Sequence, residues 1–516
     1  MKTVWKILLL VGISLLAFIG IWMMTMRIRP ENGVEAYKKL LRAKGEKLEI
    51  AEVLPPPVPP ESNGVEVVES AFAALLTLDD WTNLPTTMQM VAPGRAMIGW
   101  QQPDVRANDF TNSWANVITA AEASRPAREL LIQAAAYPAL DFHLDYQKGP
   151  EMSLRHLMPL KRSAQKLAAA AVCDLHNGDA ASATTNVCAL LALVQGERDE
   201  RTLISQLVRI AMSSIAASAS WELLQATNSN DDELTMLQRS WERLGFIEPL
   251  EKSLLMERAF TETTLTKMRT DAAEFNRYFG SSGAGGASGT GGSGDWLDSL
   301  KDFWGETKSA YAVSMWRASW SYSDELNALQ GDQIILEALR AMETNRVFNP
   351  AYSNMLTQLA AIGITNEPDD WFLKKLDIPD YRRMFSDGNS SLSVRTTMTA
   401  EASKRIVVTA IALKRFQLKH GNFPENLTEL TPEFVSSVPL DPVDGKPLRY
   451  RRNADGTFLL YSIGEDGVDD GGNPTNAASG SSSLYWLRAR DWVWPQPATE
   501  AEVQSYYEEQ AKKSGN

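Results

Sequence analysis

The chain has 516 residues, of which 51 are Lys or Arg and 64 are Asp or Glu, so its formal net charge is −13. This acidic balance argues against a general nucleic-acid binder, which needs a basic face for phosphates. With 44% hydrophobic and 22% charged residues, the composition is that of a folded globular protein. Two cysteines exclude a disulfide framework or a four-thiolate zinc site, and four histidines argue against a multi-histidine metal centre.

A membrane anchor is predicted near the start of the chain. Residues 7–26 carry no charge, and a helix of that length, at about 1.5 Å per residue, spans roughly the 30 Å of a bilayer core. Lys2 and Lys6 precede the run and no small-residue cleavage site follows it, which is typical of an uncleaved signal anchor. Basic residues after the run oppose the positive-inside rule, but long downstream domains are translocated largely regardless of them. We therefore expect residues 1–6 in the cytoplasm, one span in the cytoplasmic (inner) membrane, and an extracytoplasmic body.

Residues 27–64 form the predicted juxtamembrane segment. A short basic helix from Glu35 to Lys44 precedes the proline-rich stretch Leu54–Gly64. Proline fixes φ and lacks an amide donor, so this stretch is not expected to be helical. The sequence predicts a stiff spacer that holds the next domain away from the membrane.

Helical patterning dominates residues 65–390. Apolar residues recur at spacings of three and four along Leu160–Leu175 and again along Ala180–Val194, on either side of a His-Asn-Gly-Asp turn. This pattern predicts an antiparallel helical hairpin, and a third helix is expected to begin near Thr202. The Gly/Ser-rich residues 280–294 are predicted to form a flexible loop inside this domain.

Few residues of the helical domain suggest chemistry. Cys173 and Cys188 lie on the two arms of the hairpin, where they could form a disulfide in an oxidising compartment or serve as small buried apolar residues. Asp141, His143 and Asp145 lie close together, but a solvated or capping role is favoured over acid–base chemistry. No nucleophile-elbow, zinc-protease or P-loop pattern occurs in the sequence.

The strongest signal lies in residues 391–498. A helix is expected from about Val394 to Lys419, ended by His-Gly. Two strand-like segments, Leu448–Arg452 and Thr457–Ser462, flank an Asn-Ala-Asp-Gly turn, and the acidic, glycine-rich loop Ser462–Pro474 follows. The sequence therefore predicts a small α+β domain made of a long helix and a short antiparallel sheet.

The order of motifs in this domain resembles the globular domain of the major pseudopilin of type II secretion systems. After the long helix, the matching motifs are Gly-Asn-Phe-Pro (421–424), Val-Pro-Leu-Asp-Pro (438–442), Asp-Gly-Lys-Pro-Leu-Arg-Tyr (444–450), Tyr-Ser-Ile-Gly-Glu-Asp-Gly (461–467) and Asp-Trp-Val-Trp (491–494). In that family a calcium ion organises the loop after the hairpin. By this resemblance its carboxylate ligands fall on Asp466 and Asp491.

The composition of the acidic loop agrees with a calcium site. Carboxylates among glycines supply hard oxygen ligands, and free backbone carbonyls can complete a set of six to eight. Asp469 and Asp470 are additional candidate ligands, although they do not match the family pattern. The alternative is a solvated acidic turn without a metal.

The sequence departs from a pseudopilin in its first part. It begins MKTVWKILLL, without the family's processing motif, and about 370 residues separate the predicted anchor from the domain. The resemblance therefore implies the fold and the metal rather than assembly into a filament. The upstream region resembles uncharacterised membrane-anchored bacterial envelope proteins, which have a proline-rich spacer and a helical hairpin ahead of the same domain.

Together these features predict a mainly α protein, with a membrane-anchored helical-hairpin ectodomain, a small pseudopilin-like domain at 391–498 and a polar tail at 499–516. The leading hypothesis is a non-enzymatic, single-pass envelope protein with a partner-binding helical ectodomain and a calcium-stabilised module. Its expected partners are the membrane and envelope proteins, not nucleic acid. One alternative is an accessory component of a type II secretion or pilus-like machine. The other is an envelope glycan or peptide hydrolase that uses the tryptophan-rich region 296–320.

Overall fold

The structure is a computed structural model that describes residues 31–76, 84–107, 110–271, 273–275, 277, 313–314, 316–362, 388–476 and 485–514. The predicted anchor, residues 7–26, and the predicted Gly/Ser-rich loop, residues 280–294, lie outside these ranges. The described chain is mostly helical with small sheets, so the expectation of a mainly α protein is confirmed.

The α-helices are 31–43, α2 (Ile50–Val53), α3 (Val65–Leu76), α4 (Trp114–Ala123), α5 (Arg125–Ala134), α6 (Leu157–His176), α7 (Ala180–Gly196), α8 (Leu203–Leu224), α9 (Asp231–Glu242), α10 (Ile247–Thr270), α13 (Ser321–Asn345), α14 (Asn349–Ala361), α16 (Gly388–His420) and α17 (Glu500–Ser514). The strands are β1 (Gln89–Ala92), β2 (Arg95–Met97), β3 (Val105–Ala107), β4 (Phe110–Asn112), β5 (Arg449–Arg452), β6 (Phe458–Ser462), β7 (Trp492–Val493) and β8 (Gln496–Pro497). They form the sheets β1-β2-β8, β3-β4 and β5-β6-β7.

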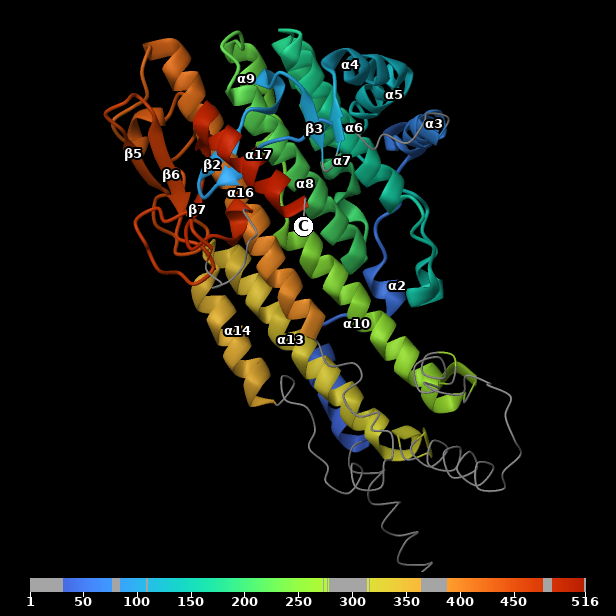
Figure 1. Cartoon of the computed structure of the whole chain (residues 1–516). Helices are drawn as coiled ribbons and strands as arrows, with labels where there is room; N and C mark the ends of the chain where they lie inside the picture. The colour runs from blue at the N-terminus through green and yellow to red at the C-terminus, as the bar shows by residue number, and fades with distance from the viewer. Residues whose placement is uncertain are drawn as a thin grey trace, which may run out of the picture.

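Long helices form the body of the molecule. Figure 1 shows α8, α10, α13 and α16 running along it, with the strands β5, β6 and β7 beside the upper part of α16. The α6–α7 hairpin packs on α8, and α7 also contacts α5 and α9. α10 packs along α13, while α3 packs on α5 at the opposite side from the C-terminal sheet.

The predicted helical hairpin is confirmed, and local signals explain its ends. Gly178 has a φ of +78° in the turn, a conformation that glycine adopts without strain. The Asp179 side chain accepts a hydrogen bond from the Ser182 amide at 2.9 Å and so caps α7. α8 begins in the same way, because the Thr202 hydroxyl accepts a hydrogen bond from the Ser205 amide at 3.1 Å.

The C-terminal helix and hairpin form where the sequence predicts them. α16 ends at Gly421, which has a φ of +79° and donates its amide to the Gln417 carbonyl at 2.8 Å. β5 and β6 pair antiparallel, with Arg449 opposite Tyr461, and β7 extends the sheet by pairing antiparallel with β6. A long helix and a three-stranded antiparallel sheet, which we call the C-terminal module, therefore follow the helical region.

The hydrophobic core runs without a break from the helical region into the C-terminal module. α16 contacts α8, α9, α10 and α13 as well as β6. Ile406, Val407 and Ile411 of α16 are fully buried and belong to the same cluster as Leu190 of α7 and Leu460 of β6. The predicted domain boundary near residue 391 therefore falls inside a continuous core, with α16 shared by both parts.

Residues before the proline-rich stretch also belong to this body. Val34 and Leu41 of helix 31–43 pack against Leu329 of α13. Glu46, just after this helix, accepts hydrogen bonds from Arg258 of α10 at 3.0 Å and from Arg340 of α13 at 2.5 Å. The predicted spacer therefore connects two parts of one folded body instead of separating a domain from what precedes it.

The last described residues close the fold on its N-terminal half. β8 pairs parallel to β2, with Gln496 opposite Arg95. The predicted polar tail forms α17, which packs on β1, and Arg95 forms an ion pair with Glu502 at 3.2 Å. The first sheet therefore joins segments about 400 residues apart in the sequence.

Among the described helices, α8 has the length and apolar composition of a membrane span, and more than half of that stretch is buried inside the protein. It packs against α6, α7 and α16. Its apolar sequence is explained by this central position in the core.

Candidate functional site

The predicted metal loop lies between β6 and β7. Gly464 and Gly472, with φ values of +72° and +83°, bend it at two points. A Cβ atom at Gly464 would lie 1.9 Å from the carbonyl oxygen of Arg490, so only glycine permits this approach of the loop to the chain before β7. The loop is therefore held tightly against Asp491.

The Asp491 carboxylate lies inside the loop and binds its backbone amides. Its side chain is 0% exposed, and its carboxylate accepts hydrogen bonds from the amides of Gly472 at 2.8 Å and Asn473 at 2.9 Å, with a longer contact of 3.5 Å from the Asp470 amide. Burial raises the pKa of Asp491, although these amide bonds act in the opposite direction. The carboxylate is thus an acceptor for loop backbone donors.

The other three predicted ligands point to separate partners. Asp469 accepts hydrogen bonds from the Tyr461 hydroxyl and the Gly471 amide, both at 3.0 Å, and from Arg449 at 3.3 Å. Asp470 lies 3.7 Å from Arg490. Asp466 is exposed and accepts the Val468 amide at 3.0 Å.

These four aspartates do not converge on one point. The described part of the chain has one group in which at least three possible metal-ligand atoms of His, Cys, Asp or Glu lie within 4.8 Å of one another. That group does not include any of these four aspartates. Protein donors bind the carboxylates of Asp491 and Asp469. A calcium ion here would depend heavily on backbone oxygens, and calcium binding stays a prediction.

A pocket of about 850 Å³ lies where the C-terminal module meets the helical region. It is lined by residues of α8, α14 and α16 and by both arms of the acidic loop, and it includes Asp466. Its apolar lining includes Tyr352, Leu356 and Trp492, and three arginines contribute positive charge. We call this hollow the junction pocket.

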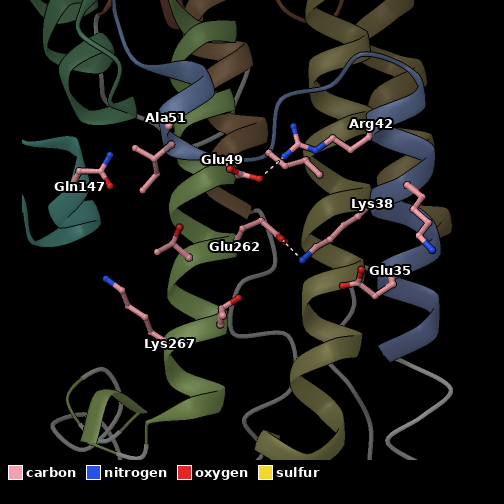
Figure 2. A pocket seen from close by; sticks show the side chains of 13 residues that line it. Glu35, Lys38, Arg42, Glu49, Ala51, Gln147, Glu262 and Lys267 are labelled. Atoms are coloured by element: carbon pink, nitrogen blue, oxygen red, sulfur yellow. Dashed lines mark hydrogen bonds and ion pairs between the residues drawn. The ribbon is translucent and has the colours of Figure 1, made fainter.

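A second pocket, also of about 850 Å³, lies between helix 31–43, α2 and α10. Figure 2 shows two of the charged pairs among its lining residues, Lys38 with Glu262 and Arg42 with Glu49. Lys38 contacts Glu262 at 2.5 Å and also Glu325, while Arg42 contacts Glu49 at 2.8 Å. The pairs of Lys38 attach helix 31–43 to α10 and α13, and the pair of Arg42 joins this helix to the segment before α2.

The group that does converge consists of His156, Glu197 and Glu200. His156 is the residue before α6, Glu197 follows directly after α7, and Glu200 lies three positions before the first residue of α8. The group therefore lies at the open end of the helical hairpin, opposite its turn. Leu140 packs there against Gly196, where a Cβ atom would lie 2.6 Å from the leucine side chain.

His156 and Glu200 form a buried pair. The Nε2 atom of His156 lies 3.1 and 2.9 Å from the two carboxylate oxygens of Glu200. His156 is 9% exposed and Glu200 is 8% exposed. The Ser205 hydroxyl donates to the same carboxylate. Phe142 stacks on the imidazole ring with centroids 4.2 Å apart, which fixes the ring orientation.

Glu197 lies beside this pair and is 2% exposed. Both of its carboxylate oxygens are buried without a hydrogen-bond partner. Burial raises the pKa of Glu197 well above its usual value, and the neighbouring Glu200 raises it further. The arrangement brings one imidazole nitrogen and two carboxylates together away from water, which is a donor set for a divalent metal.

Little in the sequence points to the group of His156, Glu197 and Glu200. Its members are separated by 41 and 3 positions, and only folding of the hairpin brings His156 to the others. The one local signal is a pair of glutamates, Glu197 and Glu200, in a short connection between two strongly apolar helices. Acidic residues in such a connection are usually solvated, so their burial depends on the packing of Phe142 and Leu140.

The remaining candidates have structural roles. Cys173 and Cys188 are free thiols. Cys173 packs near Trp114 of α4, and burial raises its pKa to about 12. Asp141 and Asp145 accept hydrogen bonds from the amides two residues further on, so both cap local turns.

The structure describes only some of the tryptophans in the region 296–320, on which the hydrolase hypothesis depends. Trp296 and Trp304 lie outside the described residues. Trp316 is fully buried, packs with Phe275, and donates its indole N–H to Asp324 at 2.7 Å. Trp316 therefore belongs to the core, as aromatic residues at helical spacing usually do.

Comparisons with known proteins add no name to this geometry: no protein-family model, no curated protein and no solved structure matches the chain.

Proposed function

We propose that the protein is a non-enzymatic, single-pass protein of the bacterial envelope, in which the helical region and a pseudopilin-like C-terminal module together bind a partner protein. The anchor is the segment 7–26, and the body lies outside the cytoplasmic membrane. The proposal includes calcium at the acidic loop as a stabilising ion.

The observation that carries the proposal is the junction pocket. It opens between α14, α16 and the acidic loop, so both parts of the molecule must be present to form it. Arg395 contacts Glu465 at 3.4 Å, and Arg488 and Arg490 add positive charge to a wall that also contains Tyr485. Arginine and aromatic side chains beside apolar surface are typical of protein-binding sites.

The shared helix supports binding rather than filament assembly. One side of α16 packs on β6 and other sides pack on α8 and α9. A filament subunit would need a free N-terminal helix to pack on its neighbours. Here the helix is occupied within the chain, and the pocket beside it remains open to an extended, acidic segment of another protein.

The binding proposal is tested by site-specific photocrosslinking of the full chain in its own cells. A crosslinker at Leu356, which is 41% exposed and lines the pocket, is compared with one at Met236 of α9, which is 44% exposed and is not one of the residues that line it. We expect one discrete adduct from Leu356 that Arg488→Glu reduces at least about tenfold, because reversing an exposed charge at the rim of the pocket disfavours an acidic partner. Equal adducts from both positions, or no effect of Arg488→Glu, would contradict the proposal.

Calcium is tested by thermal unfolding of the purified full chain with calcium and with chelator. Asp466→Ala is the informative variant, because this side chain accepts one local amide bond and its removal leaves the core intact. A rise of the melting temperature with calcium in the unaltered protein that is absent in Asp466→Ala supports the metal. An identical curve with and without calcium removes calcium from the proposal and leaves the binding pocket untouched.

A further inference from the structure

The carboxylate of Glu197 is buried without any donor to stabilise it. Both oxygens lack a hydrogen-bond partner, and the residue is 2% exposed. Buried carboxylates are normally paired, hydrogen-bonded or bound to a metal, because an uncompensated charge away from water is costly. Something other than the described side chains must therefore neutralise Glu197.

The nearest cation does not do so. Arg209 is fully buried, but its N–H groups bind the carbonyls of Val194 at 2.6 Å and Gly245 at 2.9 Å, and the side-chain oxygen of Gln206 at 3.3 Å. Its charge acts on Glu197 at a distance without a hydrogen bond. His156 is likewise engaged with Glu200.

The spacing of the three ligand atoms suits one shared cation. They all lie within 4.8 Å of one another. Zinc binds histidine nitrogen and carboxylate oxygen at about 2.0–2.2 Å, so ligands of one ion are separated by at most about 4.4 Å. Small side-chain movements bring the three atoms into that range, and two carboxylates balance the charge of a divalent ion.

We infer that His156, Glu197 and Glu200 form a buried site for a divalent first-row transition cation such as Zn²⁺. The mixture of one imidazole and two carboxylates favours such a cation over Ca²⁺, which takes oxygen ligands. The cation takes the place of the proton between His156 and Glu200, and the Ser205 hydroxyl or a water completes the coordination.

The site has a structural role in this arrangement. Its ligands come from the start of α6, the end of α7 and the connection to α8, so one ion ties together three segments at the open end of the hairpin. Each ligand residue is at most 9% exposed, which leaves no access for a substrate. Closed sites of this kind contribute to folding rather than to catalysis.

The test measures bound metal in untagged full-length protein. We expect one zinc per chain to remain after dialysis, and Co²⁺ replacing it to give visible absorption bands. Glu197→Gln keeps the size of the side chain but removes a ligand, and we expect it to weaken zinc binding at least about a hundredfold and to abolish the zinc-dependent rise in melting temperature.

Glu222→Gln is the matched control. Glu222 is also fully buried, but it accepts hydrogen bonds from the amides of Met88 at 2.7 Å and Gly99 at 3.1 Å and lies outside the convergent group. This variant should retain zinc and its melting-temperature shift even if its overall stability changes. His156→Gln, checked for folding by circular dichroism, provides a second ligand variant.

Two results would overturn the inference. One is zinc retention or a zinc-dependent shift that is the same in the unaltered protein, Glu197→Gln and His156→Gln. The other is metal-free protein that neither zinc nor cobalt stabilises, with an infrared band of a protonated carboxyl that Glu197→Gln removes. In that case a proton, not a cation, neutralises Glu197. Neither result affects the photocrosslinking test of the junction pocket.

Discussion

A buried carboxylate in the acidic loop, that of Asp491, accepts hydrogen bonds, whereas the buried carboxylate of Glu197 at the open end of the α6–α7 hairpin accepts none. Asp491 is completely buried, yet loop amides donate to both of its oxygens. Glu197 is nearly as buried, and neither of its oxygens has a partner. An acidic, glycine-rich sequence thus surrounds a carboxylate that is already satisfied, whereas an unremarkable connection between helices leaves one unsatisfied. Unmet hydrogen-bonding capacity, more than acidic composition, indicates where a cation belongs.

The first way to break this comparison is Asp491→Ala. It leaves the partly buried amides of Gly472 and Asn473 without their acceptor, and we expect a loss of about 3 kcal/mol in the free energy of unfolding. Urea unfolding of the full chain in chelator measures it. Asp470→Ala, which removes an ion pair at 3.7 Å from Arg490, is the control and should cost less than about 1 kcal/mol. Similar losses in both variants would mean that Asp491 does not close the loop.

Glu222 sharpens the comparison because it is buried like Glu197 and bonded to amides like Asp491. Burial raises its pKa from 4.5 to about 8, although the amide bonds oppose this shift. Between these values the folded state holds a proton that the unfolded state has lost, so this contribution to stability is complete below about pH 4.5 and is lost as the pH rises to about 8.

The expected slope is at most about 1.4 kcal/mol per pH unit, measured as the difference between the unaltered protein and Glu222→Gln in urea unfolding at a series of pH values. The variant has no carboxyl to titrate at this position, so its curve should lack this slope. Parallel pH profiles for the two proteins would show that the amides of Met88 and Gly99 keep Glu222 ionised.

The smallest expected effect is that of Glu197→Gln in metal-free protein. No donor loses its acceptor and no void is created, so we expect the free energy of unfolding to change by less than about 1 kcal/mol. Chemical unfolding in chelator measures this value. A loss comparable to that of Asp491→Ala would reveal a donor to Glu197 and remove the contrast between the two regions.

Local patterns were sufficient to predict much of the fold. The spacing of apolar residues located the α6–α7 hairpin, and the Asn-Ala-Asp-Gly turn located the β5–β6 pair. They were not sufficient for α16. Ala402, Ile406 and Ala410 recur at a spacing of four and form one apolar stripe, but Val407 and Ile411, which lie off that stripe, are also fully buried. Apolar residues around the helix were the overlooked signal of its shared position in the core.

The candidate sites were harder to predict for a related reason. Asp491 was identified by its motif, but the structure shows its carboxylate bound by amides, a property of loop conformation that residue types do not encode. His156 carries no motif at all, and it approaches Glu200 because α6 and α7 return the chain to the same place. Convergence of distant residues depends on tertiary packing, and a single sequence does not display it.

The pairing of β2 with β8 has a consequence for how the chain is made. At a synthesis rate of about 5–20 residues per second, the partner strand emerges roughly 20–80 s after β2. Throughout that interval β2 can pair with β1, but the edge of β2 that β8 later covers has no partner. An unpaired strand edge is a site where another chain can add a strand, so we expect the nascent chain to need protection of this edge until its last residues are made.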